Sequence, residues 1–243
     1  MIQGHLHKMK SCLKTEGVDY SLVVDDNLYV LEEYLGREIS IRFLNQIHCI
    51  ACGKSTRKSF NQGFCYGCFI KLARNDRCVM KPELCHFAQG TCREPEWGMA
   101  HCMQPHIVYI SWSSGLKVGL TKPSQVPTRW IDQGASEAVA ICQVASRFHA
   151  GLIEDYLRTW YNDKTNWRKM LTHHGKIDID LVKEALVVQE KIKHSELGPE
   201  IMRHVEYFKP EVVRVSYPID AYGPIKSFSL DKTPVVSGCL LGI

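Results

Sequence analysis

Four cysteines between residues 49 and 68 constrain the fold of this chain more than any other feature. Cys49 and Cys52 form CIAC, and Cys65 and Cys68 form CYGC, so the pattern is C-x2-C-x12-C-x2-C. A C-x2-C pair on a tight turn presents two thiolates to one ion, and two pairs complete the tetrahedral S4 shell that Zn²⁺ favours. We therefore expect a structural zinc site without an open coordination position. An iron–sulfur cluster is the alternative, because it also takes four thiolates.

A second set of four cysteines follows, with longer and less regular spacing. Its members are Cys78, Cys85, Cys92 and Cys102, separated by six, six and nine residues. The histidines nearby could substitute as ligands; they are His86, His101 and His106. We expect a second metal here, with a set of buried free thiols as the alternative. The chain has 11 cysteines in all, and an odd number without a secretion signal argues against a disulfide framework.

The chain divides into four regions by composition, and together they predict an α+β fold. Residues 1–47 read as a β-rich lead-in, with strand-like pieces such as SLVVDD and REISIRFL. Residues 48–105 hold eight of the 11 cysteines and cannot bury enough apolar surface without a metal. Residues 106–175 form an α/β core, and residues 176–243 form a helical and β-rich C-terminal region. This last region stops in the apolar run VVSGCLLGI, so we expect the natural domain to extend further.

The stretch HIVYISWSSGLKVGLT, residues 106–121, predicts a β-hairpin. A three-residue loop at residues 113–115 places Trp112 opposite Leu116 and Tyr109 opposite Gly119. The other face carries Tyr109, Ser111, Lys117, Gly119 and Thr121, and six large apolar side chains share the first face: Val108, Ile110, Trp112, Leu116, Val118 and Leu120. A two-residue loop would mix the faces, because a slip of one residue turns every side chain over. We expect a polar front on which Gly119 leaves room for a ligand opposite the Tyr109 hydroxyl.

Helices and strands alternate after the hairpin. PTRWIDQ predicts a short helix ended by Gly134, and the strand AVAICQV follows. HAGLIEDYLRTWY predicts a helix whose core-facing stripe is Leu152, Ile153, Tyr156, Leu157 and Trp160. NWRKML predicts a helix capped by Asp163 or Thr165, and residues 178–197 predict another, begun near Asp180 and ended by Gly198. Strands over VEYFKPEVVRVSYPID and IKSFSL complete the chain.

The charge distribution is consistent with a nucleic-acid partner. Net charge is +4 with histidine neutral, which permits such a partner without requiring one. One segment is strongly basic: residues 51–81 contain Asp76 as their single acid. Their basic residues are Lys54, Arg57, Lys58, Lys71, Arg74, Arg77 and Lys81. These residues either contact phosphate or form a solvated face that compensates the thiolates.

No stretch of the sequence suggests a membrane. No apolar run approaches the ~20 residues that span a bilayer, and the N-terminal stretch lacks the apolar segment of a signal peptide. We therefore expect a cytoplasmic protein without a membrane partner. The oligomeric state and the choice between DNA and RNA stay open.

Two family resemblances emerge from these motifs. Over residues 106–162 the order of motifs and elements resembles the GIY-YIG nuclease superfamily. This order is VYI, LKVG, an arginine on a short helix, a strand and a helix bearing glutamate. Over residues 45–240 the chain more closely resembles the DUF2797 family. The motifs that carry this second resemblance are CYGC, PELCHFAQGTCREPEWG, LKVGLT, PTRWIDQGA and DKTNWRKML.

The GIY-YIG resemblance implies a catalytic site of four residues. Tyr109 would be the first motif tyrosine, and Lys117 stands where a second tyrosine is usual. The resemblance implies that Arg129 holds a phosphate, that Glu154 places one Mg²⁺ on the scissile phosphate, and that the tyrosine acts as a base or positions substrate. Because Lys117 replaces a tyrosine, phosphate binding is better supported than cleavage. The superfamily often adds an asparagine, for which Asn162 and Asn166 are candidates.

Three functional hypotheses remain open at this point. The first is a zinc-containing nucleic-acid-binding protein with a GIY-YIG-like core that acts as a Mg²⁺-dependent nuclease. The second is a nucleic-acid-binding module without catalysis, whose affinity depends steeply on salt. The third is a structural or redox protein in which the metal clusters themselves are functional.

Overall fold

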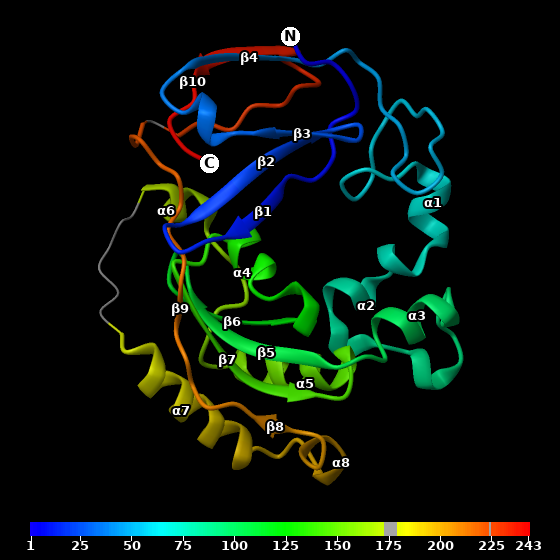
Figure 1. Ribbon diagram of the computed structural model, residues 1–243. Helices are drawn as coiled ribbons and strands as arrows, with labels where there is room; N and C mark the ends of the chain where they lie inside the picture. The colour runs from blue at the N-terminus through cyan, green and yellow to red at the C-terminus, as the bar shows by residue number, and fades with distance from the viewer. Residues whose placement is uncertain (173–178, 224) are drawn as a thin grey trace.

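The computed structural model describes residues 1–172, 179–223 and 225–243. It shows a mixed α+β fold with several sheets (Figure 1), as the sequence predicts. The expected boundary between residues 175 and 176, and the first residue of the helix expected over 178–197, lie outside the described residues.

The N-terminal region consists of two small sheets. Strands β1 (Lys10–Leu13), β2 (Val18–Val24) and β3 (Asn27–Val30) form an antiparallel sheet in that order, followed by the 3₁₀ helix η1 (Glu32–Tyr34). Strand β4 (Glu38–Arg42) pairs instead with β10 (Val235–Cys239), so segments from opposite ends of the chain lie side by side (Figure 1).

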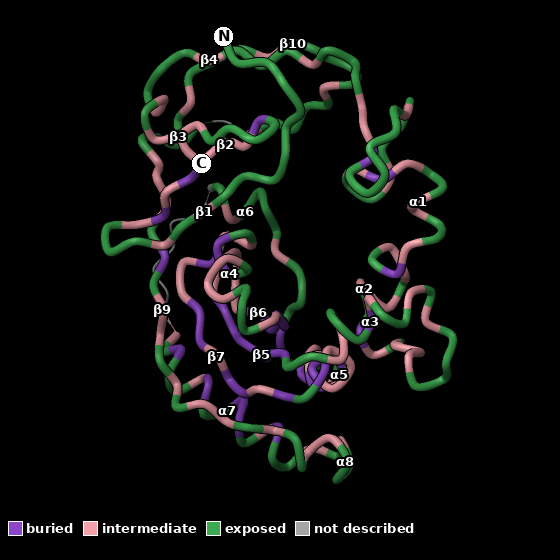
Figure 2. Tube along the Cα trace, turned by 45° about the vertical axis from the view of Figure 1, so that its right-hand side comes forward, coloured by how far each residue is buried: buried purple, intermediate pink, exposed green. Residues whose placement is uncertain are grey.

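The cysteine-rich region is a series of short helices that contains none of the named strands. These are α1 (Tyr66–Lys71), η2 (Ala73–Asn75), α2 (Arg77–Met80), η3 (Pro82–Leu84), η4 (Phe87–Gln89) and α3 (Pro95–His101). Five of the residues from 48 to 105 are buried: Cys49, Phe64, Ala73, Pro82 and Gly98. Figure 2 shows this contrast with the central sheet, where buried residues are concentrated. So small a buried set fits the expectation that metal stabilises the region.

The central sheet contains the predicted hairpin. Its strands are β5 (His106–Trp112), β6 (Leu116–Thr121), β7 (Glu137–Val144) and β8 (Glu206–Tyr207), in the order β6-β5-β7-β8, and β9 (Val213–Arg214) also pairs with β7. Trp112 lies opposite Leu116 and Tyr109 opposite Gly119. The predicted register is therefore confirmed, and with it the three-residue loop.

The two faces of this sheet are covered by different helices. Helices α5 (Arg147–Leu157) and α7 (Leu181–Lys193) contribute to the larger core, which includes Val108 and Val118 of the hairpin. On the opposite face, α4 (Thr128–Asp132) packs Trp130 against Tyr109. The remaining elements are η5 (Pro123–Gln125), α6 (Trp167–Thr172) and α8 (Pro199–Met202).

Several local predictions need correction. Trp160 is 48% exposed, because α5 already ends at Leu157, and its ring lies 4.3 Å from the Lys191 ammonium. Helix α6 is capped by Asn166, whose Oδ1 accepts from the Lys169 N–H, rather than by Asp163 or Thr165.

Two predictions near the C-terminal end are also wrong. Helix α7 begins after Asp180 as predicted but ends at Lys193, and Gly198 instead precedes α8. IKSFSL contains no strand within its described residues, 225–230. Within the described residues, none of the helices combines the length and apolar character that crossing a membrane requires.

Candidate functional site

The four cysteines of the first set converge on one point. Their four Sγ atoms all lie within 4.8 Å of one another; they belong to Cys49, Cys52, Cys65 and Cys68. The Sγ atoms of Cys52 and Cys65 are 3.9 Å apart. A tetrahedral ZnS4 centre with bonds of about 2.3 Å has edges of about 3.8 Å. The donor set therefore fits a structural zinc ion, for which four thiolates leave no open position.

Local backbone features position these thiols. Gly53 adopts a positive φ of 70° directly after the first pair, and its N–H donates to the Cys49 carbonyl at 2.8 Å. Cys65 and Cys68 straddle the start of α1, where the Phe69 N–H donates to the Cys65 carbonyl. Each C-x2-C pair thus occupies one compact turn, which explains why their spacing predicts convergence.

Two of the four thiols, Cys49 and Cys68, have pKa values shifted in opposite directions. Nearby backbone N–H groups, foremost that of Cys65, lower the pKa of Cys49 to about 6. Burial raises the pKa of Cys68 to about 12, and the neighbouring thiols act in the same direction. Four thiolates so close together repel one another, and a dication at their centre would offset that repulsion.

The second cysteine set has a different arrangement. Cys78 Sγ lies within 4.8 Å of donor atoms of Asp76 and His86, and these three form the second potential metal group among the described residues. The pKa of Cys78 is raised to about 11. Burial is the largest cause, and the charges of Asp76, Cys85, Cys102 and Cys92 raise it further. The other three cysteines therefore influence Cys78 electrostatically, although the group that could hold a metal contains Cys78 alone of the four.

His86 has the surroundings of a metal ligand. Its Nδ1 lies 2.7 Å from Thr91 Oγ1, and its Nε2 lies 3.6 Å from Asp76 Oδ2. Ligating histidines commonly use the second ring nitrogen in this way. Asp76 also pairs with Arg93 Nε at 2.7 Å, so it is the least available of the three donors.

The two other histidines suggested by the sequence are engaged elsewhere. His101 Nδ1 lies 2.9 Å from the Trp97 carbonyl. His106 is buried at 1% exposure, and its Nδ1 lies 2.8 Å from the Gln104 carbonyl. Burial lowers the pKa of His106 to about 4. Of the three, only His86 belongs to the group that could hold a metal.

The second set is also anchored to α5 by contacts that need no metal. The Arg147 guanidinium donates to the Val79 carbonyl at 2.6 Å, and Arg158 pairs with Glu83 at 3.0 Å. Gly151 allows this approach: a Cβ there would lie 2.5 Å from Pro82 Cβ and 2.9 Å from the Glu83 nitrogen. The helix that carries Glu154 therefore lies directly against the segment between Cys78 and Cys85.

The polar face of the hairpin is buried, which corrects the expectation of an open front. Tyr109 is 0% exposed and Lys117 2%. Both donate to one acceptor, Gln133 Oε1, at 2.7 Å from the tyrosine hydroxyl and 2.8 Å from the ammonium. The ammonium also donates to Thr165 Oγ1 at 2.7 Å. Gly119 makes room for the Tyr109 ring itself, since a Cβ there would lie 2.6 Å from the hydroxyl oxygen.

Arg129 and Glu154 approach this buried network from more accessible positions. Arg129 is exposed on α4, and Glu154 is half-buried on α5. The Arg129 charge lowers the pKa of both Tyr109 and Lys117, and the Glu154 charge raises both. The structure therefore brings the four sequence-predicted residues into one electrostatic neighbourhood.

The pKa values restrict the chemistry of these groups. Burial raises the pKa of Tyr109 to about 12, so a role as base, which would need a lowered pKa, is not favoured. Burial lowers the pKa of Lys117 to about 8. Burial raises the pKa of Glu154 to about 7, although Arg158 and Arg147 act in the opposite direction. Glu154 and Lys117 are thus the two groups that change protonation near neutral pH.

Two residues of the network escaped the sequence reasoning. Gln133 directly follows the last residue of α4, and its contact with Lys117 depends on how α4 packs on the sheet. Thr165 belongs to a segment whose Asn162 carbonyl accepts from the Val118 N–H at 2.9 Å. Of the asparagine candidates, Asn162 thus pairs through its backbone with β6, and Asn166 caps α6.

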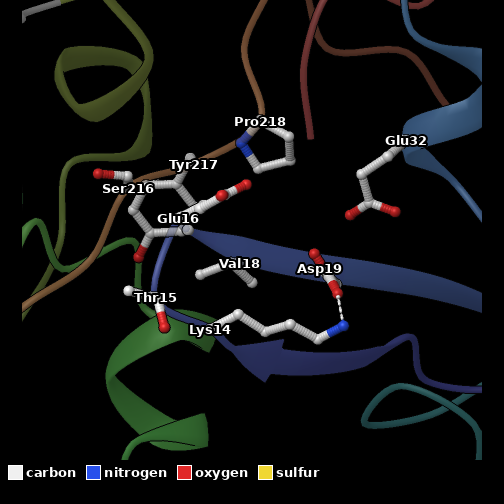
Figure 3. Close-up of a pocket in the computed structure, with 10 residues that line it drawn as sticks. Lys14, Thr15, Glu16, Val18, Asp19, Glu32, Ser216, Tyr217 and Pro218 are labelled. Atoms are coloured by element: carbon white, nitrogen blue, oxygen red, sulfur yellow. Dashed lines mark ion pairs between the residues drawn. The ribbon is translucent and has the colours of Figure 1, made fainter.

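A separate pocket of about 460 Å³ lies between the β1–β2 turn and residues 216–218. Figure 3 shows Lys14 paired with Asp19 in it, with Glu16 and Glu32 nearby. None of the sequence-predicted site residues lines this pocket.

Residues 36–243 match the model of a family described as "Protein of unknown function (DUF2797)". No curated protein and no solved structure matches the chain. The DUF2797 resemblance is therefore confirmed, and the GIY-YIG resemblance stays a prediction.

Proposed function

This chain belongs to the DUF2797 family, and from its hairpin site and cysteine sets we propose that it is a zinc-containing protein that binds nucleic acid through phosphate. The phosphate would meet Arg129 first, with the Lys117 charge beneath it and the Glu154 carboxylate beside it.

The observation that carries this proposal is the grouping of two cations around Tyr109. Arg129 is exposed and can offer its planar guanidinium to two oxygens of one phosphate. Lys117 is buried, and within the described residues its ammonium pairs with the neutral acceptors Gln133 and Thr165 rather than with a carboxylate. Because a buried charge without a counter-ion is unfavourable, an anion bound at Arg129 would be stabilised by Lys117 as well.

Glu154 could recruit a divalent cation to the same phosphate. Mg²⁺ usually takes one or two carboxylates together with substrate phosphates and waters. The pKa of Glu154 is about 7 because of burial, so its carboxyl group becomes an effective ligand above that pH. Any Mg²⁺ dependence should therefore appear as the pH rises through 7.

Mg²⁺-dependent cleavage is the second candidate function. The order of hairpin, arginine on α4, strand β7 and glutamate on α5 favours it, by resemblance to the GIY-YIG superfamily. In such a reaction Tyr109 would position groups, since its pKa is raised. Lys117, with a pKa of about 8, is closer to the range in which a group can exchange a proton at neutral pH.

Binding can be tested with fluorescently labelled oligonucleotides and the zinc-loaded full chain. Arg129→Ala should weaken affinity about tenfold or more. The slope of log affinity against log salt concentration should also fall by about one. Arg203→Ala removes the same charge from an exposed site at the end of α8, where Arg203 pairs with Glu200, and should leave affinity unchanged. Equal affinity of wild type and Arg129→Ala would contradict the proposal.

The Lys117 contribution has a pH signature. The protonated ammonium attracts phosphate, and its pKa is about 8, so affinity should fall as the pH rises from 7 to 9. Lys117→Met should bind more weakly at pH 7 and lose this dependence. A wild-type affinity that is independent of pH over this range would argue against a phosphate-facing Lys117.

Cleavage is tested by incubating the same DNA and RNA oligonucleotides with Mg²⁺. Cutting by wild type that Glu154→Gln abolishes would establish the nuclease, whereas equal cutting by both proteins would assign it to a contaminant.

Metal analysis tests the third hypothesis. We propose two zinc ions per chain, one at each cysteine set, with no absorbance in the visible region. Iron with acid-labile sulfide would instead favour a redox cluster.

A further inference from the structure

The segment that carries the first cysteine set has an unusual charge balance. Residues 49–75 contain no acidic residue and five basic ones: Lys54, Arg57, Lys58, Lys71 and Arg74. A Zn²⁺ ion with four thiolates carries a formal charge of −2, so compensation of the thiolates uses two of the five charges. Three positive charges remain on this small unit, which favours a polyanionic partner.

Aromatic rings lie among these charges. The Lys58 ammonium sits 5.3 Å from the centroid of the Phe60 ring. The Phe60 ring is in turn 5.4 Å from the Tyr66 ring and is stacked on Phe69 at 5.6 Å. Lys58, Phe60 and Tyr66 therefore form a continuous row of one cation and two rings, which we call the Tyr66 row.

The outer member of this row faces solvent. Tyr66 is 60% exposed, although it directly follows the zinc-binding Cys65, whereas Phe64 on the other side of that cysteine is 6% exposed. Ile70, one helical turn along α1, is 47% exposed. Tyr66 thus presents an aromatic ring to solvent directly beside the first cysteine set.

We propose that the Tyr66 row is a stacking platform for single-stranded nucleic acid, with unpaired bases on Tyr66 and the backbone phosphates beside Lys58. This inference rests on the proposed nucleic-acid function and names its substrate class. Stacking on an exposed ring needs an unpaired base, because paired bases inside a duplex hide their faces. The surrounding positive charge would hold the backbone, whatever the sequence of the strand.

The test compares single strands with a duplex on the full zinc-loaded chain. Labelled oligo(dT), oligo(U) and a DNA duplex of the same length are titrated at fixed salt. Tyr66→Ala should weaken single-strand binding by roughly 5- to 100-fold and should change duplex binding by much less. Tyr66→Phe, which keeps the ring, should bind like wild type. Lys58→Ala should weaken the binding of all three ligands and make their affinity depend less steeply on salt concentration.

The outcomes separate this inference from the proposed function. Tyr66→Ala could bind single strands as tightly as wild type while Arg129→Ala binds them weakly. The proposal for the Tyr66 row is then overturned, and the proposal for the hairpin site stands. If Tyr66→Ala weakens binding of the single strand and of the duplex equally, Tyr66 does not select unpaired bases and the stacking platform is overturned. Wild-type zinc content in Tyr66→Ala shows that a loss of affinity is not a loss of fold. If the wild type binds none of the three probes, both proposals fail.

Discussion

The two cysteine sets occupy adjacent segments of one chain but are built in different ways. In the first set, four Sγ atoms converge within 4.8 Å and the surrounding segment buries few side chains. In the second, Cys78 converges with Asp76 and His86, and the segment is held to α5 by Arg147, Arg158 and the close approach at Gly151.

This difference shows how spacing limits what a cysteine pattern can specify. A C-x2-C pair fixes two ligands within one turn, so the local backbone determines the geometry. Gaps of six to nine residues spread the second set over several short elements: Cys78 lies in α2, Cys85 and Cys102 directly follow η3 and α3, and Cys92 lies between η4 and α3. The ligand positions then depend on how those elements pack. We therefore expect the first set to depend more strongly on metal than the second.

The largest effect is expected from the first set. Cys52→Ser should remove one zinc ion per chain, and residues 48–75 should become sensitive to protease, because structural zinc supplies on the order of 10 kcal/mol in small zinc domains. Zinc content and limited proteolysis measure both effects. Cys12→Ser is the matched control, since Cys12 is exposed and lies outside both sets. Full zinc content in Cys52→Ser would contradict the expectation that the first set depends more strongly on metal than the second.

A smaller effect is expected from the second set. Thr91→Val removes the hydroxyl beside His86 Nδ1 and should weaken the proposed metal binding at the second set about 10- to 100-fold, the usual range for the loss of such a partner. Competition with a chelator measures the affinity. The first metal should be retained, which provides an internal control.

Cys92→Ser then decides which donors complete the second site. Loss of metal as severe as in Cys78→Ser would favour the four-cysteine set predicted from spacing. A mild effect would favour a mixed set built on Cys78 and His86.

The smallest effect concerns the docking of the second set onto α5. Gly151→Ala should destabilise the protein by about 1–3 kcal/mol, because its methyl group would collide with the backbone of Pro82 and Glu83. Thermal or denaturant unfolding measures this change. Gly67→Ala in α1 is the contrasting substitution: apart from the adjoining residues and the helix's own backbone, no atom lies within 4 Å of the new methyl group. We expect stabilisation of about 0.5–1 kcal/mol. An unchanged stability in Gly151→Ala would mean that the contact with α5 adjusts freely.

The same contrast between local and nonlocal information explains which predictions succeeded. The hairpin register could be predicted because alternation along two adjacent strands, together with loop length, leaves one arrangement that separates apolar from polar side chains. The burial of Lys117 could not be predicted, because Gln133 and Thr165 reach it from segments whose packing no local pattern encodes. Helical spacing predicts that Trp160 lies in the core, but the helix ends three residues earlier.

The candidate site was predictable in a similar, partial way. The resemblance to GIY-YIG motifs named Tyr109, Lys117, Arg129 and Glu154, and the structure places their charges close enough to influence one another. Spacing could not reveal that Tyr109 has a raised pKa, since the burial responsible for it comes from tertiary packing.

The pairing of β4 with β10 has a consequence for the order of events during synthesis. Ser40 and Ser237 bond through their side chains across a separation of 197 residues. At about 5–20 residues per second, a ribosome needs roughly 10–40 s to make the intervening chain. For that time β4 is a strand without its partner, and unpaired edges are prone to associate with other chains. The nascent N-terminal region should therefore depend on chaperones or on its own solubility until β10 emerges.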